Sequence, residues 1–222
     1  MKTGVIAFIL ISTAALAQAQ KKIEQGTVTY AVTYELTPEQ KSMFDVSLLP
    51  AENVMEFNNN LGRVRMDMGA ALVKIIADAD TKTALLLVDV PIAQKQFATK
   101  MSAQEVAEQR GDIKYSNFKP TGQKQTIAGY NAEKYTYSDN KSTNYELWLT
   151  KDVRLAKGAE YEDFAALNGT PVKYSMTVNG VKSHYTLKSI KEGPVAKLSM
   201  EVPAGYELKT AAEMAAMQGG GQ

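Results

Sequence analysis

The chain is dominated by apolar and polar residues that alternate with a period of two. In residues 27–36, Val28, Tyr30, Val32 and Tyr34 lie on one face and threonines on the other. Such alternation predicts a strand with one buried face. The same pattern returns in residues 63–68, 143–149, 172–178, 181–187 and 198–202. We therefore expect an antiparallel sheet of roughly nine to eleven strands.

Turn signals separate these strands. Asn179-Gly180 is the dipeptide preferred in two-residue hairpin turns. Further hairpin turns are predicted at residues 58–61, 79–82 and 139–141. Residues 84–90 are apolar on both faces apart from Asp89, which predicts a strand that is central or covered on both sides.

Helical signals are few. Thr37-Pro38-Glu39-Gln40 predicts a capped helix that runs toward Leu48, and Ser102-Ala103-Gln104-Glu105 predicts one ending near Arg110. Residues 160–167 and 207–217 are two further candidates. A sheet this long has to curl. The predicted fold is a mainly β, curved antiparallel half-barrel with a few short helices covering its concave face.

The N-terminus is typical of an export signal. Met1-Lys2 precedes an apolar run, Val5–Leu16, that is too short to span a bilayer, and Ala17-Gln18-Ala19 fits a signal-peptidase site. We predict cleavage between Ala19 and Gln20, in preference to a retained anchor, and a periplasmic or secreted protein that does not span the membrane. One domain is expected over residues 20–206, followed by a helical or flexible tail over 207–222.

Composition removes several classes of function. The formal charge of +1 gives no field for nucleic acid, and the absence of cysteine excludes disulfides and thiolate metal sites. The single histidine, His184, falls on the polar side of its strand, and no nucleophile elbow, P-loop or dinucleotide fingerprint is present. We expect neither a cofactor nor a metal site, and no enzymatic activity.

Three acidic residues are candidates for chemistry: Asp78, Asp80 and Asp89. Asp78 and Asp80 lie in a predicted turn, and the rest of a calcium loop is missing around them. Asp89 has apolar neighbours, so burial would raise its pKa, whereas an edge location or a salt bridge would keep it ionised. The second interpretation is favoured.

The predicted inner face is rich in tyrosine and methionine, an adaptable apolar lining. These residues are either plain core or the wall of a ligand cavity, and a curved sheet with few helices favours a cavity. The candidate ligand-binding residues are Tyr30, Tyr34, Met66, Met68, Tyr145, Leu147, Tyr174, Met176, Tyr185 and Met200. Trp148 alternates with Leu147 and Leu149 and faces the other way, as covered core or as an exposed partner contact.

A family resemblance adds to this picture. The segments Arg63–Met68 (RVRMDM), Thr121–Tyr135 (TGQKQTIAGYNAEKY), Leu147–Thr150 (LWLT) and Val202–Tyr206 (VPAGY) occur in this order after a first strand that begins Gly26-x-x-x-Tyr30. The order resembles the exported domain-of-unknown-function family numbered forty-four twelve, common in Bacteroidetes; the exported GLPGLI family shares the style of the first strand. The resemblance implies a fold similar to the lipoprotein carriers LolA and LolB, whose concave sheet receives acyl chains. It carries no catalytic residues.

These observations favour a periplasmic, non-enzymatic binding protein for an apolar ligand: an acyl chain, a lipid or a lipidated protein. The alternative is a structural or interaction module with a filled core that contacts an envelope protein. A hydrolase working through Asp89 is the third hypothesis. The tail, residues 207–217, is a candidate lid over the cavity.

Overall fold

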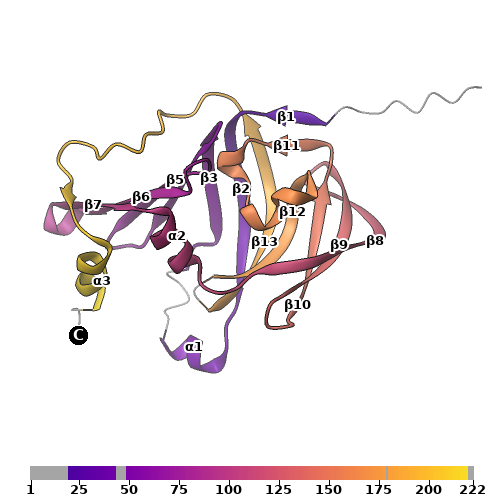
Figure 1. The fold of residues 1–222 in the computed structure, drawn as a ribbon, viewed down its shortest axis with the longest axis horizontal. Helices are drawn as coiled ribbons and strands as arrows, with labels where there is room; N and C mark the ends of the chain where they lie inside the picture. Colours follow the sequence, from indigo (N-terminus) through magenta and orange to yellow (C-terminus); the bar gives the residue numbers. More distant parts are fainter. Residues whose placement is uncertain (1–19, 44–48, 179, 220–222) are drawn as a thin grey trace, which may run out of the picture.

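The computed structural model describes residues 20–43, 49–178 and 180–219, so the predicted signal peptide lies outside the described residues. Figure 1 shows the arrangement of the strands and short helices. The elements are β1 (Lys21–Ile23), β2 (Gln25–Glu35), α1 (Pro38–Met43), β3 (Glu52–Asn58), β4 (Leu61–Asp67), β5 (Leu72–Asp78), β6 (Thr83–Val90), η2 (Pro91–Ala93), β7 (Lys95–Met101), α2 (Ala103–Arg110), β8 (Tyr115–Ile127), β9 (Tyr130–Asp139), β10 (Asn144–Thr150), β11 (Val153–Leu155), η3 (Lys157–Ala159), η4 (Glu162–Leu167), β12 (Thr170–Val178), β13 (Val181–Glu192), β14 (Glu207–Leu208) and α3 (Ala211–Gly219).

One sheet dominates the fold, and it is mainly antiparallel, as predicted. Its twelve strands run in the order β14-β7-β6-β5-β4-β3-β2-β13-β12-β10-β9-β8. Strands β2–β7 form one meander, here called the first meander, and β8–β10, β12 and β13 form the second meander. They join where β2 pairs with β13, with Val32 opposite Tyr185. The sheet exceeds the predicted strand number, partly because the two-residue β14 adds a parallel edge to β7.

The local signals behave as the sequence predicts. Ser102 and Glu105 exchange the two hydrogen bonds of a capping box at α2. At α1 the Gln40 side chain accepts from the Thr37 N–H, and Thr37 Oγ1 accepts from the Gln40 N–H. The predicted turns at residues 58–61, 79–82 and 139–141 each separate two paired strands. The predicted end of α1 near Leu48 falls outside the described residues, since the described helix ends at Met43.

The inner face of the sheet, which carries Tyr30, Tyr174 and Tyr185, is covered mainly by the segment from β11 to η4. Phe164 of η4 is only 1% exposed. Its ring packs against the residues Tyr115, Phe118, Tyr137, Tyr161 and Tyr174. Earlier in the same segment, Gly158 packs so closely on Gly62 of β4 that a Cβ on either residue would meet backbone. One short segment therefore touches both β4 and β8, so the sheet curves around it (Figure 1).

The chain after β13 crosses the other side of the sheet. Residues 193–206 contain no strand, so the strand predicted over 198–202 is wrong. Pro194 and Pro203 remove backbone donors from this stretch, which disfavours a place inside a sheet. Instead Met200, Val202 and Tyr206 pack on a small aliphatic cluster of Ile76, Leu85, Leu87 and Ala98. We call residues 193–206 the C-terminal strap.

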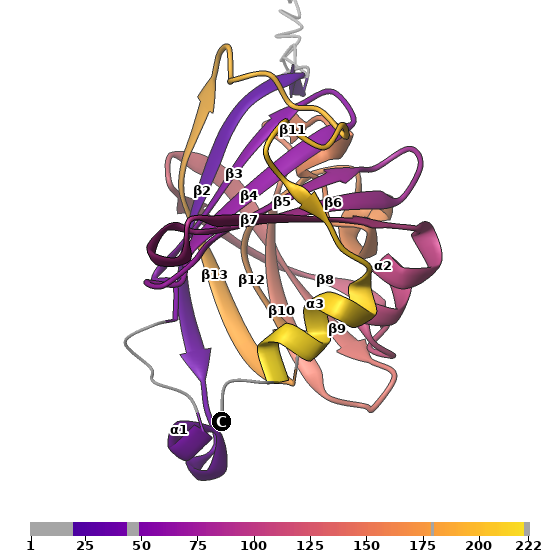
Figure 2. The same cartoon turned by 90° about the vertical axis from the view of Figure 1, so that its left-hand side faces the viewer.

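Beyond the strap, the chain wraps around the edge of the first meander. Strand β14 pairs with β7, and α3 then contacts β7 with Met214 buried. Figure 1 shows the strap and α3 on opposite sides of β5–β7, and Figure 2 looks onto edge strand β7 with β14 and α3 beside it. The far end of the chain thus covers the edge that β7 would otherwise expose.

Candidate functional site

The apolar pocket of the inner face lies where the two meanders join. It has a volume of about 260 Å³, and β2, β3, β4, β13 and the loop before β3 form its walls. The lining residues are Val32, Tyr34, Leu49, Pro50, Glu52, Asn53, Val64, Arg65, Met66, Val181, Ser183 and Tyr185. We call it the inner pocket.

Alternation along the strands positions its walls. Val32 and Tyr34 project from β2 on the same side, as Ser183 and Tyr185 do from the neighbouring β13. The Tyr34 hydroxyl donates a 2.7 Å hydrogen bond to the Pro50 carbonyl, which fixes the loop against β2. The loop therefore forms one wall of the pocket.

Two tyrosines and one glutamate at this pocket are held neutral or paired. Burial raises the pKa of Tyr34 above its ordinary value. The pKa of Tyr185 is raised as well, first by burial and then by the nearby Tyr161 and Tyr34. Both hydroxyls stay protonated at neutral pH, and the Glu52 carboxylate is paired with Lys188. These groups are suited to lining a pocket and poorly suited to acid–base chemistry.

The predicted site residues fall into separate places. Tyr34, Met66 and Tyr185 line the inner pocket. Met176 packs, partly buried, against the main core. Four others are exposed by 5% or less, belong to that core and do not line the inner pocket: Tyr30, Tyr145, Leu147 and Tyr174.

Two of the predicted positions are corrected by the structure. Met68 follows the end of β4 and is 41% exposed, because the chain turns away from the sheet there. Met200 lies on the strap and packs on the outer face of β5–β7, so the inner face assigned to it is wrong. The apolar spacing around Met200 reflects contact with a sheet and not membership of one.

Several pocket residues were missed by the sequence reasoning. Val32 and Val64 share the predicted inner face with named candidates, so strand alternation was a sufficient signal for them. Leu49 and Pro50 come from a loop whose path depends on tertiary contacts, and no local pattern marks them. The tail proposed as a lid contributes no lining residue within the described part of the chain.

Asp89 forms a polar cluster on the opposite face of the sheet. Its carboxylate accepts from Lys74 Nζ at 2.8 Å, from Gln96 at 2.8 Å and from the Tyr206 hydroxyl. Burial acts to raise the pKa of Asp89, but these hydrogen bonds outweigh it and hold the pKa below the ordinary value. The salt-bridge interpretation is confirmed, and Asp89 ties the strap to the first meander.

By its fold, the protein belongs to the class of mainly β proteins built on one curved, mainly antiparallel sheet, with an apolar pocket on the inner face. The family described as Domain of unknown function (DUF4412) matches residues 36–169. The chain belongs to this family, as its motifs predicted.

Among solved structures, the chain is similar to that described as "Crystal structure of MucB", with 12% identity and a TM-score of 0.34. The match covers 85% of this chain and 60% of the MucB chain, so this chain spans less than two thirds of that length. A likeness this loose transfers neither a site nor a function. No curated protein matches the chain. Within the described residues, no helix has the length and apolar character needed to cross a membrane.

Proposed function

We propose that this protein is a non-enzymatic binding protein that holds an apolar ligand in the inner pocket, in the periplasm or outside the cell. The observation that carries the proposal is the pocket itself, lined mainly by apolar side chains from four strands and a loop. Pockets of this character, with a few polar groups at the margin, are typical of small-molecule sites.

The size of the pocket favours one acyl chain segment over a whole lipid. Its volume of about 260 Å³ lies just below the range of common drug-sized sites, roughly 300–1,000 Å³. Each methylene transferred from water into such a pocket contributes about 0.8 kcal/mol. A fatty acid or the acyl chain of a lipidated protein therefore fits the chemistry of the walls.

A matched pair of methionines provides the test. Met66 lines the pocket, whereas Met68, two residues further on, is exposed outside it. We expect Met66→Asp to weaken binding of a fluorescent fatty acid by at least tenfold, because a carboxylate would have to be desolvated beside the acyl chain. Met68→Asp should leave binding unchanged, and circular dichroism should show that both variants are folded. Equal affinity in the two variants would contradict the proposal.

A second function is favoured by the filled part of the molecule. Around Phe164 the core is filled by stacked and edge-on aromatic rings. This supports an interaction module that contacts an envelope protein through its surface. Native mass spectrometry of the protein purified from periplasm separates the two: a lipid mass lost on denaturation supports the carrier, whereas bare protein that also fails to bind the fatty acid supports the module.

A further inference from the structure

The sheet splits on its outer face between β10 and β12. The two strands pair from Thr150 opposite Thr170 only as far as Leu147 opposite Tyr174. Before Leu147, β10 continues to pair with β9, and after Tyr174, β12 continues to pair with β13. The two strands therefore diverge while each keeps its other neighbour.

Tyrosine side chains close this split from the inner side. The Tyr137 hydroxyl donates to the Ser175 carbonyl, and the Tyr115 hydroxyl accepts from the Thr177 N–H at 2.8 Å. The Tyr145 hydroxyl lies 3.2 Å from Thr177 Oγ1. Hydroxyl groups thus replace strand pairing with the β12 backbone, and the outer side of the split remains open.

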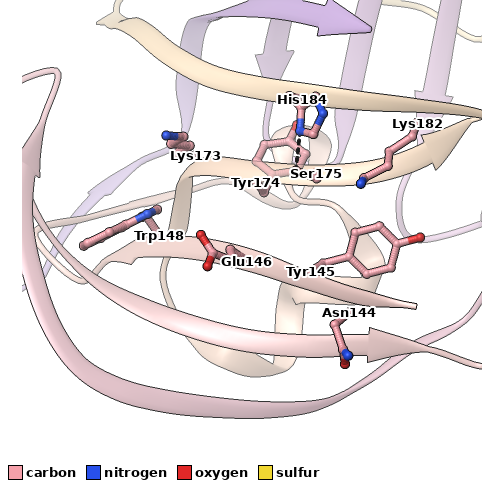
Figure 3. Close-up of a pocket in the computed structure, with 9 residues that line it drawn as sticks. All are labelled: Asn144, Tyr145, Glu146, Trp148, Lys173, Tyr174, Ser175, Lys182 and His184. Carbon is pink, nitrogen blue, oxygen red and sulfur yellow. Dashed lines mark hydrogen bonds between the residues drawn. The ribbon is translucent and has the colours of Figure 1, made fainter. Parts of the chain in front are cut away.

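The opening is a cleft of about 250 Å³, here called the outer cleft. Figure 3 shows its two rows of side chains, one from β10 and the other from β12 and β13. The lining residues are Asn144, Tyr145, Glu146, Trp148, Lys173, Tyr174, Ser175, Lys182 and His184. Lys182 and His184 alternate with Ser183 and Tyr185 of the inner pocket, so the two sites lie on opposite faces of the sheet.

The charges of the outer cleft do not cancel. Lys182 pairs with Glu35 at 2.8 Å, and Glu146 pairs with Lys134 at 2.6 Å. Lys173 is exposed and forms no ion pair with any residue that the structure describes. One positive charge is therefore left over beside the half-buried ring of Trp148.

Ser175 and His184 supply hydrogen-bonding groups rather than a catalytic triad. Ser175 Oγ lies 2.7 Å from His184 Nδ1, and Glu35 lies 3.4 Å from His184 Nε2. In serine hydrolases the serine contacts Nε2 and the acid contacts Nδ1, the reverse of this arrangement. The group therefore presents polar atoms to a ligand without the geometry of a nucleophile and its base.

We propose that the outer cleft binds one acidic sugar residue, a hexuronate. The flat apolar face of the Trp148 ring matches the apolar C–H face of a pyranose ring. Ligand sites commonly combine such an apolar surface with a few polar groups that orient the ligand. The Asn144 amide, the Glu146 carboxylate and the Ser175 hydroxyl offer both donors and acceptors for ring hydroxyls. Lys173 supplies the charge for one carboxylate.

Trp148 is the only tryptophan of the chain, so its fluorescence reports on this cleft directly. The full chain without its predicted signal peptide is titrated at low ionic strength with glucuronate, galacturonate, glucose and benzoate. We expect a saturable change with a uronate, at an affinity at least fivefold above that of glucose. The proposal is overturned if neither uronate changes the emission, or if benzoate binds as tightly as the better uronate.

A lysine pair supplies the control. Lys173→Gln should lower uronate affinity at least fivefold, to the level of glucose, whereas Lys191→Gln should leave it unchanged because Lys191 is exposed on β13 outside the cleft. An equal loss in both variants would mean that general surface charge attracts the uronate, and the site assignment would be wrong. Calorimetry with Trp148→Phe should show weaker binding of both uronate and glucose, and unchanged binding would equally overturn the proposal.

Discussion

The two meanders are built from similar strands but have different cores. The second meander carries a cluster of aromatic rings around Phe164, and the segment that covers it, β11 to η4, lies within its own stretch of chain. The outer face of the first meander carries a small aliphatic cluster instead, and its cover is the strap from the far end of the chain. The second meander is thus covered by a segment from its own stretch of chain. The outer face of the first meander is covered by residues about a hundred positions away in the sequence.

This difference explains where the inner pocket lies. The self-covered half is filled by large rings, which pack to the density of a protein interior. The inner pocket lies at the joint between the halves, over β2–β4 and β13, where the aromatic cover ends. The inner pocket therefore arises at the boundary between two differently packed halves and not from the curvature of the sheet alone.

The largest expected effect is on the aromatic core. We expect Phe164→Ala to lower the free energy of unfolding by about 3–5 kcal/mol, because the cavity would be enclosed by rings that cannot collapse into it. Leu85→Ala, at a fully buried position of the first meander, should cost less, about 2–3 kcal/mol, since the strap can settle onto it. Urea unfolding measures both. A larger loss for Leu85→Ala would reverse the comparison.

The next effect concerns the C-terminal strap, which covers the outer face of the first meander. Replacing both Met200 and Val202 by alanine should cost about 2 kcal/mol, because each is only partly buried against the aliphatic cluster. Hydrogen exchange should become faster in β5–β7 and stay unchanged in β12 and β13. A uniform increase across both meanders would show that the strap stabilises the whole sheet and not one half.

A smaller effect is expected where tyrosine hydroxyls replace strand pairing. Tyr137→Phe leaves the Ser175 carbonyl without its donor and should cost about 1–2 kcal/mol. Tyr135→Phe is the matched control, since the Tyr135 hydroxyl makes no hydrogen bond with the described residues. Thermal unfolding of the two variants gives the difference. Equal melting temperatures would mean that the split in the sheet is satisfied by other groups.

The smallest effect is a pH dependence, which can be compared between the halves through one carboxylate from each, Asp89 and Asp139. Burial acts to raise the pKa of Asp89 and Asp139, but hydrogen bonds outweigh it and lower both. A lowered folded-state pKa contributes stability above the unfolded value, about 3.9, and that stability is lost as pH falls through the folded value.

Acid should therefore destabilise both halves below about pH 4. Asp89 is paired with a cation, Lys74, whereas Asp139 accepts from backbone N–H groups and Tyr145. We expect added salt to weaken only the contribution of Asp89. Unfolding of Asp89→Asn and Asp139→Asn at two salt concentrations checks this, and equal salt dependence would contradict it.

Sequence alone predicts the local part of this architecture. Alternation identifies the inner residues of β2, β10, β12 and β13, and the capping box at Ser102 gives α2 its start. Alternation does not say which face is covered or by what. Met200 and Leu149 carry the same apolar signal, yet one lies on the strap and the other in the filled core. The parallel pairs β1–β11 and β14–β7 also lack a local signal, because their partners are distant in sequence.

The two candidate sites likewise differ in how far the sequence predicts them. Strand alternation predicts three residues of the inner pocket: Tyr34, Met66 and Tyr185. The outer cleft beside Trp148 arises because β10 and β12 diverge, and no residue pattern predicts that divergence. The outer cleft depends on where β10 and β12 stop pairing. That property is decided by competing side-chain contacts, here those of the tyrosine hydroxyls.

The pairing of β2 with β13 also affects the rate at which the protein folds. Each meander is a series of hairpins between neighbouring stretches, and these close quickly. The joint brings Val32 against Tyr185 across most of the sequence, and contacts of such long range slow folding. A chain that emerges from its N-terminal end carries a central strand, β2, with one edge unpaired until β13 has followed. The inner pocket, which needs both strands, therefore forms after the first meander.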